Sequence, residues 1–312
     1  MDFPEGKRYN TFVGYYKSRY GERLQKLVLD AGFSCPNRDG TVGTGGCTYC
    51  DNAAFHPGYS TPGKSLKRQI VEGIEFHKVR YRNTSHYLAY FQAYSNTYGP
   101  LSKLQSLYEE ALSHPDVVGL VIGTRPDCVD AAKLDYIASL RDRGYVVTVE
   151  YGIESCYDAT LKRINRGHTF ACAGQAVRET AARGIDTGAH FILGLPGETR
   201  QMLLDQCGLI NALPLRSVKF HQLQMVRGTA MEREFEERPG DFLRLPLDGY
   251  LDLVVDILER LRPDLYIERV AGEVPPRFVK EMQWGLVRNF QILHMLDDKL
   301  LLRDTYQGRL YR

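Results

Sequence analysis

Three cysteines lie close together near the start of the chain. Cys35 and Cys47 are separated by eleven residues, and Cys47 and Cys50 by two, in the segment CPNRDGTVGTGGCTYC. Glycines in this loop and just before it let the backbone wrap closely around a bound group. Thiolates are preferred ligands of zinc and of iron–sulfur clusters. The loop therefore predicts a metal centre held by three cysteines.

Two kinds of metal centre agree with three thiols. Three cysteines leave a four-iron cluster one ligand short of the usual four, and an open iron is what a cluster needs to bind and reduce a substrate. Zinc is the rival, with His56 as a fourth ligand. If the centre is an iron–sulfur cluster, the protein could also be a simple electron carrier. If it is zinc, the protein could be a zinc-stabilised nucleic-acid-binding module. The position of the loop, directly after an expected strand, favours a catalytic cluster.

The other cysteines are isolated from this loop and from one another. The chain has seven in total, and an odd number in a cytosolic protein argues against a disulfide framework. We expect these four to be small buried hydrophobic residues; they are Cys128, Cys156, Cys172 and Cys207.

Short β-rich runs alternate with helical patterns through most of the chain. Strands are expected at 26–33, 86–92, 117–123, 145–152, 187–194 and 217–224, and helices at 65–82, 101–112, 130–142, 155–164, 171–183 and 198–212. This alternation predicts an α/β fold with a parallel sheet and right-handed crossovers. Six such units can form most of a barrel, with its chemistry at the carboxyl ends of the strands.

The pattern divides the chain into three regions. A short N-terminal extension covers 1–25, the partial barrel covers 26–235, and a C-terminal α/β appendage covers 236–312. The last boundary is set by the charged stretch EREFEERPGD, which precedes a helix marked by Leu251, Val254, Val255, Leu258 and Leu261.

Composition limits the remaining possibilities. The chain has 312 residues, of which 43% are hydrophobic, and its formal charge is +2. These proportions are those of a globular protein. No apolar run approaches the ~20 residues that a membrane span needs, and the N-terminus lacks the apolar core of a signal peptide. We expect a cytoplasmic protein with reduced thiols and no membrane partner.

The cysteine loop resembles that of the radical S-adenosylmethionine (SAM) superfamily, including the aromatic residue Tyr49 before the last cysteine. The run LDAGFSCPNRDG…GGCTYC is similar to the YhcC/YtqA-type radical SAM proteins, whose cysteine spacing is longer than the common CxxxCxxC. That group in turn resembles the Elongator catalytic subunit, without its acetyltransferase domain. This second likeness is carried by TRPD (124–127), VEYGIES (149–155), NRGHT (165–169), LGLPGET (193–199) and RGT (227–229).

The resemblance implies a partial (β/α)6 radical SAM barrel with two cofactors. Cys35, Cys47 and Cys50 would hold three irons of a 4Fe-4S cluster, and the fourth iron would take the amino and carboxylate groups of SAM. Reductive cleavage of SAM would then yield methionine and a 5′-deoxyadenosyl radical. An external electron donor, such as a flavodoxin or ferredoxin, would be needed.

Polar residues at the ends of the expected strands are candidates for binding SAM. Gln92 lies in QAYSN, where the superfamily usually has a GGE-type motif for the amino group. Arg125 suits a carboxylate, since its fork binds two oxygens; the alternative is a local ion pair with Asp127. Glu150 can accept both ribose hydroxyls, with Glu154 and Ser155 as alternates.

Four further residues complete the expected cofactor contacts. Arg166 is implied as a partner of the methionine carboxylate, and Gly194 gives room for adenine. The backbone around Gln224 could pair with the adenine edge, and Tyr49 adjoins the cluster. No residue is assigned as catalytic.

The expected substrate is tRNA, modified on the side chain at carbon 5 of the wobble uridine. The Elongator resemblance implies this substrate. Residues 7–26 also carry six Lys/Arg and one Glu among five aromatic residues, and 64–82 holds six Lys/Arg and two Glu. Cations and exposed rings are what recognition of a single-stranded loop requires. The alternatives are solvated helix faces with buried rings, and a small metabolite as substrate.

Overall fold

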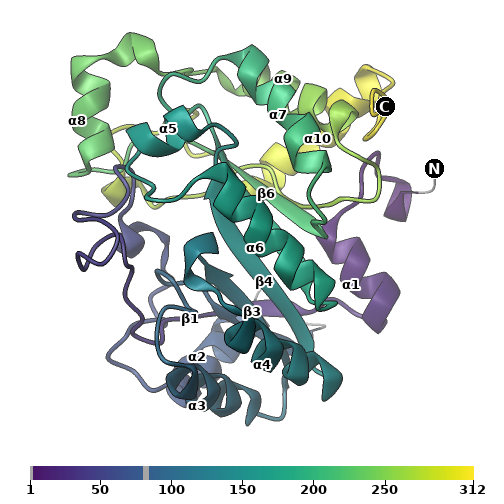
Figure 1. The fold of residues 1–312 in the computed structure, drawn as a ribbon. Helices are drawn as coiled ribbons and strands as arrows, with labels where there is room; N and C mark the ends of the chain where they lie inside the picture. Colours follow the sequence, from purple (N-terminus) through teal and green to yellow (C-terminus); the bar gives the residue numbers. More distant parts are fainter. Residues whose placement is uncertain (1–2, 80–83) are drawn as a thin grey trace.

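A single sheet of seven parallel strands organises the chain in this computed structural model, which describes residues 3–79 and 84–312. The order of the strands in the sheet is their order along the chain, from β1 to β7; β1, β3, β4 and β6 are labelled in Figure 1. The strands are β1 (Gln25–Leu29), β2 (Tyr87–Phe91), β3 (Val117–Thr124), β4 (Val146–Glu154), β5 (Asp186–Leu193), β6 (Ser217–Gln222) and β7 (Tyr266–Arg269). The sheet is curled into a half-barrel.

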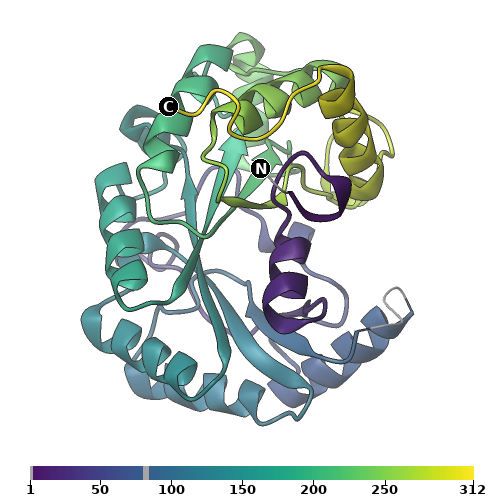
Figure 2. The ribbon, with the colours of Figure 1, turned by 90° about the vertical axis from the view of Figure 1, so that its right-hand side faces the viewer.

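Helices connect successive strands and cover the outer face of the curved sheet (Figure 2). The α-helices are α1 (Phe12–Tyr20), α2 (Leu66–Lys78), α3 (Leu101–Leu112), α4 (Ala131–Asp142), α5 (Asp158–Arg163), α6 (Phe170–Ala182), α7 (Arg200–Asn211), α8 (Ala230–Glu237), α9 (Leu247–Arg260) and α10 (Asn289–Leu302). Short 3-10 turns lie at Pro4–Gly6, Asn52–Phe55, Pro126–Cys128, Pro239–Asp241 and Pro276–Phe278. No helix in the described part of the chain is long and apolar enough to cross a membrane.

The six predicted strands and the partial barrel are confirmed, and the sheet has a seventh strand that the sequence did not reveal. Strand β7 comes from 236–312 and pairs with β6, Ser217 lying opposite Tyr266. It has four residues, of which two are charged, so no apolar run marks it. The division at residue 235 stays a prediction, but the sheet continues across it.

The convex face of the sheet carries the main core. Side chains from alternate strand positions, such as Leu27, Phe91, Leu120 and Val149, are fully buried against the outer helices. Because one face of each strand packs on helices, the other set of alternating residues is left to line the concave face. That concave face is where polar and charged side chains gather.

Helix α1 covers the base of the concave face (Figure 2). Phe12, Tyr15 and Tyr16 are buried there and pack against Leu88 and Val121 of the strands. Their spacing of three and four residues places them on one face of the helix, turned toward the sheet.

The expectation that the rings of 7–26 stack on RNA bases is therefore wrong for most of them. Tyr9, Phe12, Tyr15 and Tyr16 are each 3–5% exposed, and only Tyr20 of the five lies at the surface. These rings pack in the hydrophobic core and are therefore not available to stack on a ligand.

The second basic run, 64–82, forms a surface helix in its described part. Lys64, just before α2, and Arg68 within it both pair with Glu72, at 2.5 and 2.7 Å, and Lys78 pairs with Glu75 at 2.8 Å. Residues 80–82 of this run lie outside the described residues. The described part is a solvated helix face whose charges are largely paired internally.

Candidate cofactor site

The three-cysteine loop follows β1 at the carboxyl edge of the sheet. Cys47 is buried, Cys35 and Cys50 are half-buried, and all three thiols are free. The backbone N–H of Cys50 donates to the carbonyl of Cys47 at 3.0 Å, and that of Arg38 donates to the carbonyl of Cys35 at 2.8 Å. These two turns give the loop a compact form.

The loop is tied to the segment that follows α5. The side-chain amide of Asn165, a residue with a φ of 52°, donates to the carbonyl of Gly46 at 2.8 Å. In return, the amide of Asn37 donates to the carbonyl of Asn165 and lies 3.7 Å from the Cys47 sulfur. Gly46 itself has a φ of 79°, a backbone conformation that favours glycine. These bonds hold the buried thiol in a fixed position.

Cationic side chains surround the thiols. Arg166 is 6% exposed, and its Nη1 donates to the Cys47 sulfur at 3.4 Å. Its Nε is buried without a hydrogen-bond partner among the described residues. Arg38 donates to the Cys50 carbonyl at 2.9 Å. A buried donor left unpaired is costly, so this environment suits an additional anionic group.

The Cys50 thiol is protonated in the free protein. Burial and then the neighbouring Cys47 raise the pKa of Cys50 to about 11. Because metal ligation requires the thiolate, binding of a metal centre here would release protons.

The described residues do not form a site for one metal ion. They contain no group of three or more His, Cys, Asp or Glu side chains that could hold one. His56, the expected fourth zinc ligand, instead has its Nδ1 3.9 Å from Asp30. Tetrahedral zinc with bonds of ~2.3 Å needs ligand atoms roughly 4 Å apart, whereas a four-iron cluster is larger and its thiolates stand farther apart. With His56 beside Asp30, the three thiols lack, among the described residues, the fourth ligand expected for zinc, and three thiols are the ligand set of a four-iron cluster with one open iron.

Gln92 and Arg125 stand at the ends of neighbouring strands, as predicted. Gln92 is half-buried, and its side chain has no hydrogen bond within the described residues. Arg125 is 2% exposed and binds both carboxylate oxygens of Asp127, at 2.8 and 2.6 Å. Its third donor reaches the carbonyl of Arg166 at 2.8 Å. The local ion pair with Asp127, the alternative named for Arg125, is present, and its contact with a cofactor carboxylate stays a prediction.

Glu150 is likewise engaged by neighbouring side chains. It is 1% exposed on the concave face, and its two oxygens accept from Lys26 and Lys219, both at 2.6 Å, and contact His190 at 3.0 Å. Burial opposes ionisation, but Lys219, Lys26 and His190 together hold the pKa of Glu150 well below its usual range. Both oxygens of this ionised carboxylate are occupied by side chains of the protein, and its expected contact with the ribose stays a prediction.

The alternates named for Glu150 lie farther along the same motif. Glu154 has a φ of 74°, and its Oε1 lies 3.6 Å from Arg166. Ser155 donates to the buried Glu198 at 2.5 Å. Burial raises the pKa of Glu198 to about 7, and its second oxygen is unpaired among the described residues. Of the two alternates, Glu154 is the one beside the cysteine loop.

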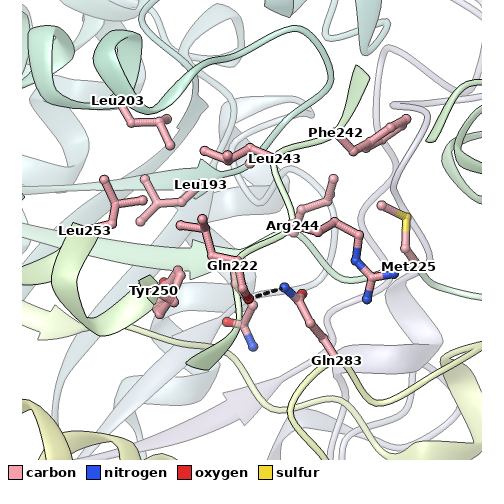
Figure 3. A pocket seen from close by; sticks show the side chains of 13 residues that line it. Leu193, Leu203, Gln222, Met225, Phe242, Leu243, Arg244, Tyr250, Leu253 and Gln283 are labelled. Carbon is pink, nitrogen blue, oxygen red and sulfur yellow. Dashed lines mark hydrogen bonds between the residues drawn. The ribbon is translucent and has the colours of Figure 1, made fainter. Parts of the chain in front are cut away.

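Gly194 lines a small cavity beyond the ends of β5 and β6 (Figure 3). A Cβ at Gly194 would lie 3.0 Å from the carbonyl of Leu243, and the residue has a φ of 92°. The cavity has a volume of about 20 Å³, which is room for about one water molecule. Its walls are mainly apolar, from residues such as Leu203, Tyr250 and Leu253 (Figure 3). Close backbone approach thus accounts for this glycine.

The last two predicted contacts are packed in different ways. Gln224 donates to the carbonyl of Gly272 at 3.2 Å, which links the end of β6 to the C-terminal region. Tyr49 is half-buried next to an apolar cluster. Burial and then Cys47 raise the pKa of the Tyr49 phenol, so the ring is neutral beside the thiols.

Four residues of this region were missed by sequence reasoning. Asn37 and Asn165 fix the loop. They lie in the motifs CPNRDG and NRGHT, of which other residues, namely Cys35 and Arg166, were predicted as site residues. His190 and Lys219 are midway along β5 and β6 and not at their ends. The sequence did carry a signal for these two residues. Four apolar strands, β1, β4, β5 and β6, each contain at least one ionisable residue, and because side chains alternate between the two faces of a strand, such residues can share one polar face of the sheet.

The fold and the cysteine loop define a class of protein. The family model of the radical SAM superfamily matches residues 39–207, and that of the radical SAM C-terminal domain matches 215–301. The chain therefore belongs to the radical SAM superfamily, an enzyme family that uses a 4Fe-4S cluster and SAM.

Within the superfamily, the chain is similar to YtqA and YhcC over most of its length. The chain is 34% identical to YtqA of Bacillus subtilis (strain 168) over 98% of this chain and 94% of that protein. It is 37% identical to YhcC of Escherichia coli (strain K12) over 85% and 84%. The resemblance to YhcC/YtqA-type proteins is confirmed.

More distant similarities reach tRNA-related proteins. A tRNA uridine(34) acetyltransferase of Dehalococcoides mccartyi (strain CBDB1) is 27% identical over 58% of this chain and 38% of that protein. The structure of Elp3 from Methanocaldococcus infernus superposes with a TM-score of 0.68, covering 91% of this chain and 64% of that one at 15% identity. This second likeness shows a shared fold.

Proposed function

We propose that this radical SAM enzyme modifies the carbon-5 side chain of the wobble uridine in tRNA. The observation that carries the proposal is the buried Cys47 thiol, which accepts a hydrogen bond from Arg166 in a loop at the carboxyl edge of the half-barrel. The relative named tRNA uridine(34) acetyltransferase supports the choice of substrate.

Cys35, Cys47 and Cys50 are the residues that would hold the cluster. When bound, the cluster and SAM together supply a carbon-centred radical after the transfer of one electron. Arg166 donates toward the cluster sulfur ligand, and hydrogen bonds to sulfur of this kind raise the reduction potential of a cluster. The electron comes from an external donor such as a flavodoxin or ferredoxin.

The residues around the cysteine loop would orient SAM. The unpaired buried Nε of Arg166 suits the methionine carboxylate, and the unbonded side chain of Gln92 suits the amino group. Glu154, the alternate to Glu150 for the ribose contact, lies beside Arg166. Tyr49, the turn at Gly194 and the backbone near Gln224 border the same edge and would limit access of water.

A groove next to the cysteine loop supports a polyanionic substrate. It has a volume of about 660 Å³ and is lined by Thr48 and by residues of α5 and α8. Three arginines and two glutamates stand in this lining: Arg163, Arg233, Arg238, Glu234 and Glu237. Arg163 and Arg238 pair with Glu234, whereas Arg233 has no ion pair within 3–79 and 84–312. Arginine binds phosphate oxygens well, and Thr48 directly follows Cys47. RNA phosphates in this groove would bring a looped-out base near the cofactor site.

The test is mass spectrometry of tRNA nucleosides from a strain that lacks this gene. We expect the wobble-uridine derivative of the wild type to decrease and its precursor to accumulate. A plasmid copy of the gene should restore the profile. An unchanged profile in the deletion strain would exclude this substrate, and a small metabolite would then be the better candidate.

A further inference from the structure

A buried charge network crosses the concave face of the half-barrel, below the edge that carries the cysteines. Glu150 of β4 is its centre, bonded to Lys26 of β1, Lys219 of β6 and His190 of β5. Glu268 of β7 accepts from both lysines, at 2.6 and 3.0 Å. The family's cofactor chemistry does not require such a network.

His190 is the member of this network that remains open to the concave space. Its side chain is 22% exposed, whereas those of Glu150 and Lys219 are 1% and 5% exposed. Its Nε2 lies 3.0 Å from the Glu150 Oε2. An ionised carboxylate oxygen can only accept a hydrogen bond, so Nε2 carries a hydrogen and donates a hydrogen bond to Glu150. The lone pair of the neutral ring is therefore on Nδ1, which has no partner among the described residues.

His190 lies close to the cysteine loop through a short chain of contacts. It stands opposite Gly152 in the register of β4 and β5, and adjacent strands are about 4.8 Å apart. The carbonyl of Gly152 accepts from Arg166, whose guanidinium also contacts the Cys47 sulfur. A substrate held between the cofactor edge and the concave face would therefore meet the His190 ring.

A second imidazole stands beside the first. The ring centroids of His190 and His221 are 5.7 Å apart. Burial, and then the positive charge of Arg269, hold the pKa of His221 well below its usual range. His221 is thus neutral, and it extends the proton-accepting surface without adding charge.

We propose that Glu150 and His190 form a carboxylate–imidazole dyad that moves a proton to or from the substrate during the radical reaction. Nδ1 of His190 accepts a proton from an N–H or O–H group of the substrate, and Glu150 stabilises the imidazolium that results. The proton then passes to solvent through the open side of the ring. No electron is transferred in this step. His190 is the catalytic residue, and Glu150 is its positioning residue.

The electrostatic surroundings agree with this division of roles. Glu150 stays ionised because Lys26 and Lys219 face it on either side, so it does not take the proton itself. The remaining groups that face the dyad are Glu268, Tyr90, His221, Arg269 and Tyr16 of α1. A carboxylate behind an imidazole fixes the tautomer and stabilises its charged form.

The inference rests on the proposed function only in needing a substrate on the concave face. The experiment therefore compares a deletion strain with the wild type for both tRNA nucleosides and small metabolites. Whichever species the deletion changes becomes the readout. If only a metabolite changes, the tRNA proposal fails while the dyad is still tested.

The deletion strain is complemented with H190Q, E150Q and, as a matched control, H294Q on the surface of α10. We expect H190Q to slow product formation at least ~100-fold, as is usual for loss of a general acid or base, and E150Q at least ~10-fold. The H294Q variant should restore the wild-type profile. In purified H190Q, the ratio of 5′-deoxyadenosine to product should rise at least ~10-fold.

Two further readouts separate proton transfer from a structural role. The wild-type rate should increase with pH along a single imidazole limb, E150Q should shift that limb to lower pH, and H190Q should lack it. Added imidazole should restore part of the activity of H190A. The dyad is excluded if H190Q forms product at the wild-type rate, or if its pH profile is unchanged.

Discussion

Replacing Cys47 by alanine abolishes the iron–sulfur centre, if the cysteine loop has the role assigned to it. Wild-type protein reconstituted without oxygen should be brown and bind about four irons per chain, the content of a 4Fe-4S cluster. Cys47 is the buried thiol, contacted by Arg166 and Asn37, so no other ligand in its surroundings can replace it. We expect the visible absorbance and the bound iron of the variant to fall to background.

The matched control is Cys172→Ala. Cys172 is also a free thiol, and it lies on the outer helix α6. This variant should retain the iron content of the wild type. Full iron content in Cys47→Ala, or an equal loss in Cys172→Ala, would contradict the ligand assignment.

Replacing Glu150 by alanine should destabilise the fold more than any surface substitution. The change removes one of the two carboxylates that Lys26 and Lys219 share on the concave face and leaves them only Glu268 among the described residues. Removal of one member of a buried ion pair typically costs about 3–5 kcal/mol. Urea unfolding of the protein without its cofactors would measure this loss. Glu109→Ala, which removes a half-exposed ion pair with Arg143, should have a much smaller effect.

The pH dependence of stability gives a second measure of the same group. Because the folded pKa of Glu150 lies below its ordinary value of 4.5, its ionisation stabilises the folded state. This contribution is complete above about pH 4.5 and is lost as pH falls toward the folded pKa. Glu150→Gln should therefore lose less stability on acidification than the wild type. Equal slopes for the two proteins would show that Glu150 is not held as an ionised buried group.

Regular local patterns accounted for most of what could be predicted. The six apolar runs, separated by helical spacing, identified six of the seven strands, because each is buried on at least one face. Strand β7 lacked this signal: with the sequence YIER it is held by its pairing with β6. Such an edge strand depends on its neighbour and not on its own composition.

In the candidate site, too, the features set by local sequence could be predicted and those set by the tertiary fold could not. The cysteines were evident because their spacing is local, in one loop. The partners of Glu150 come from positions 26, 190 and 219, and only the curvature of the sheet brings them together. A carboxylate in an apolar strand indicates a partner but not its identity. Similarly, the aromatic residues of α1 had the composition of a binding surface, and their burial depended on how that helix packs.

The formation of 5′-deoxyadenosine tests the central claim most directly. Anaerobically reconstituted protein, reduced with dithionite in the presence of SAM, should release 5′-deoxyadenosine and methionine in equal amounts. The product should be absent without reductant. A colourless protein that binds one zinc ion and forms no 5′-deoxyadenosine would contradict the account.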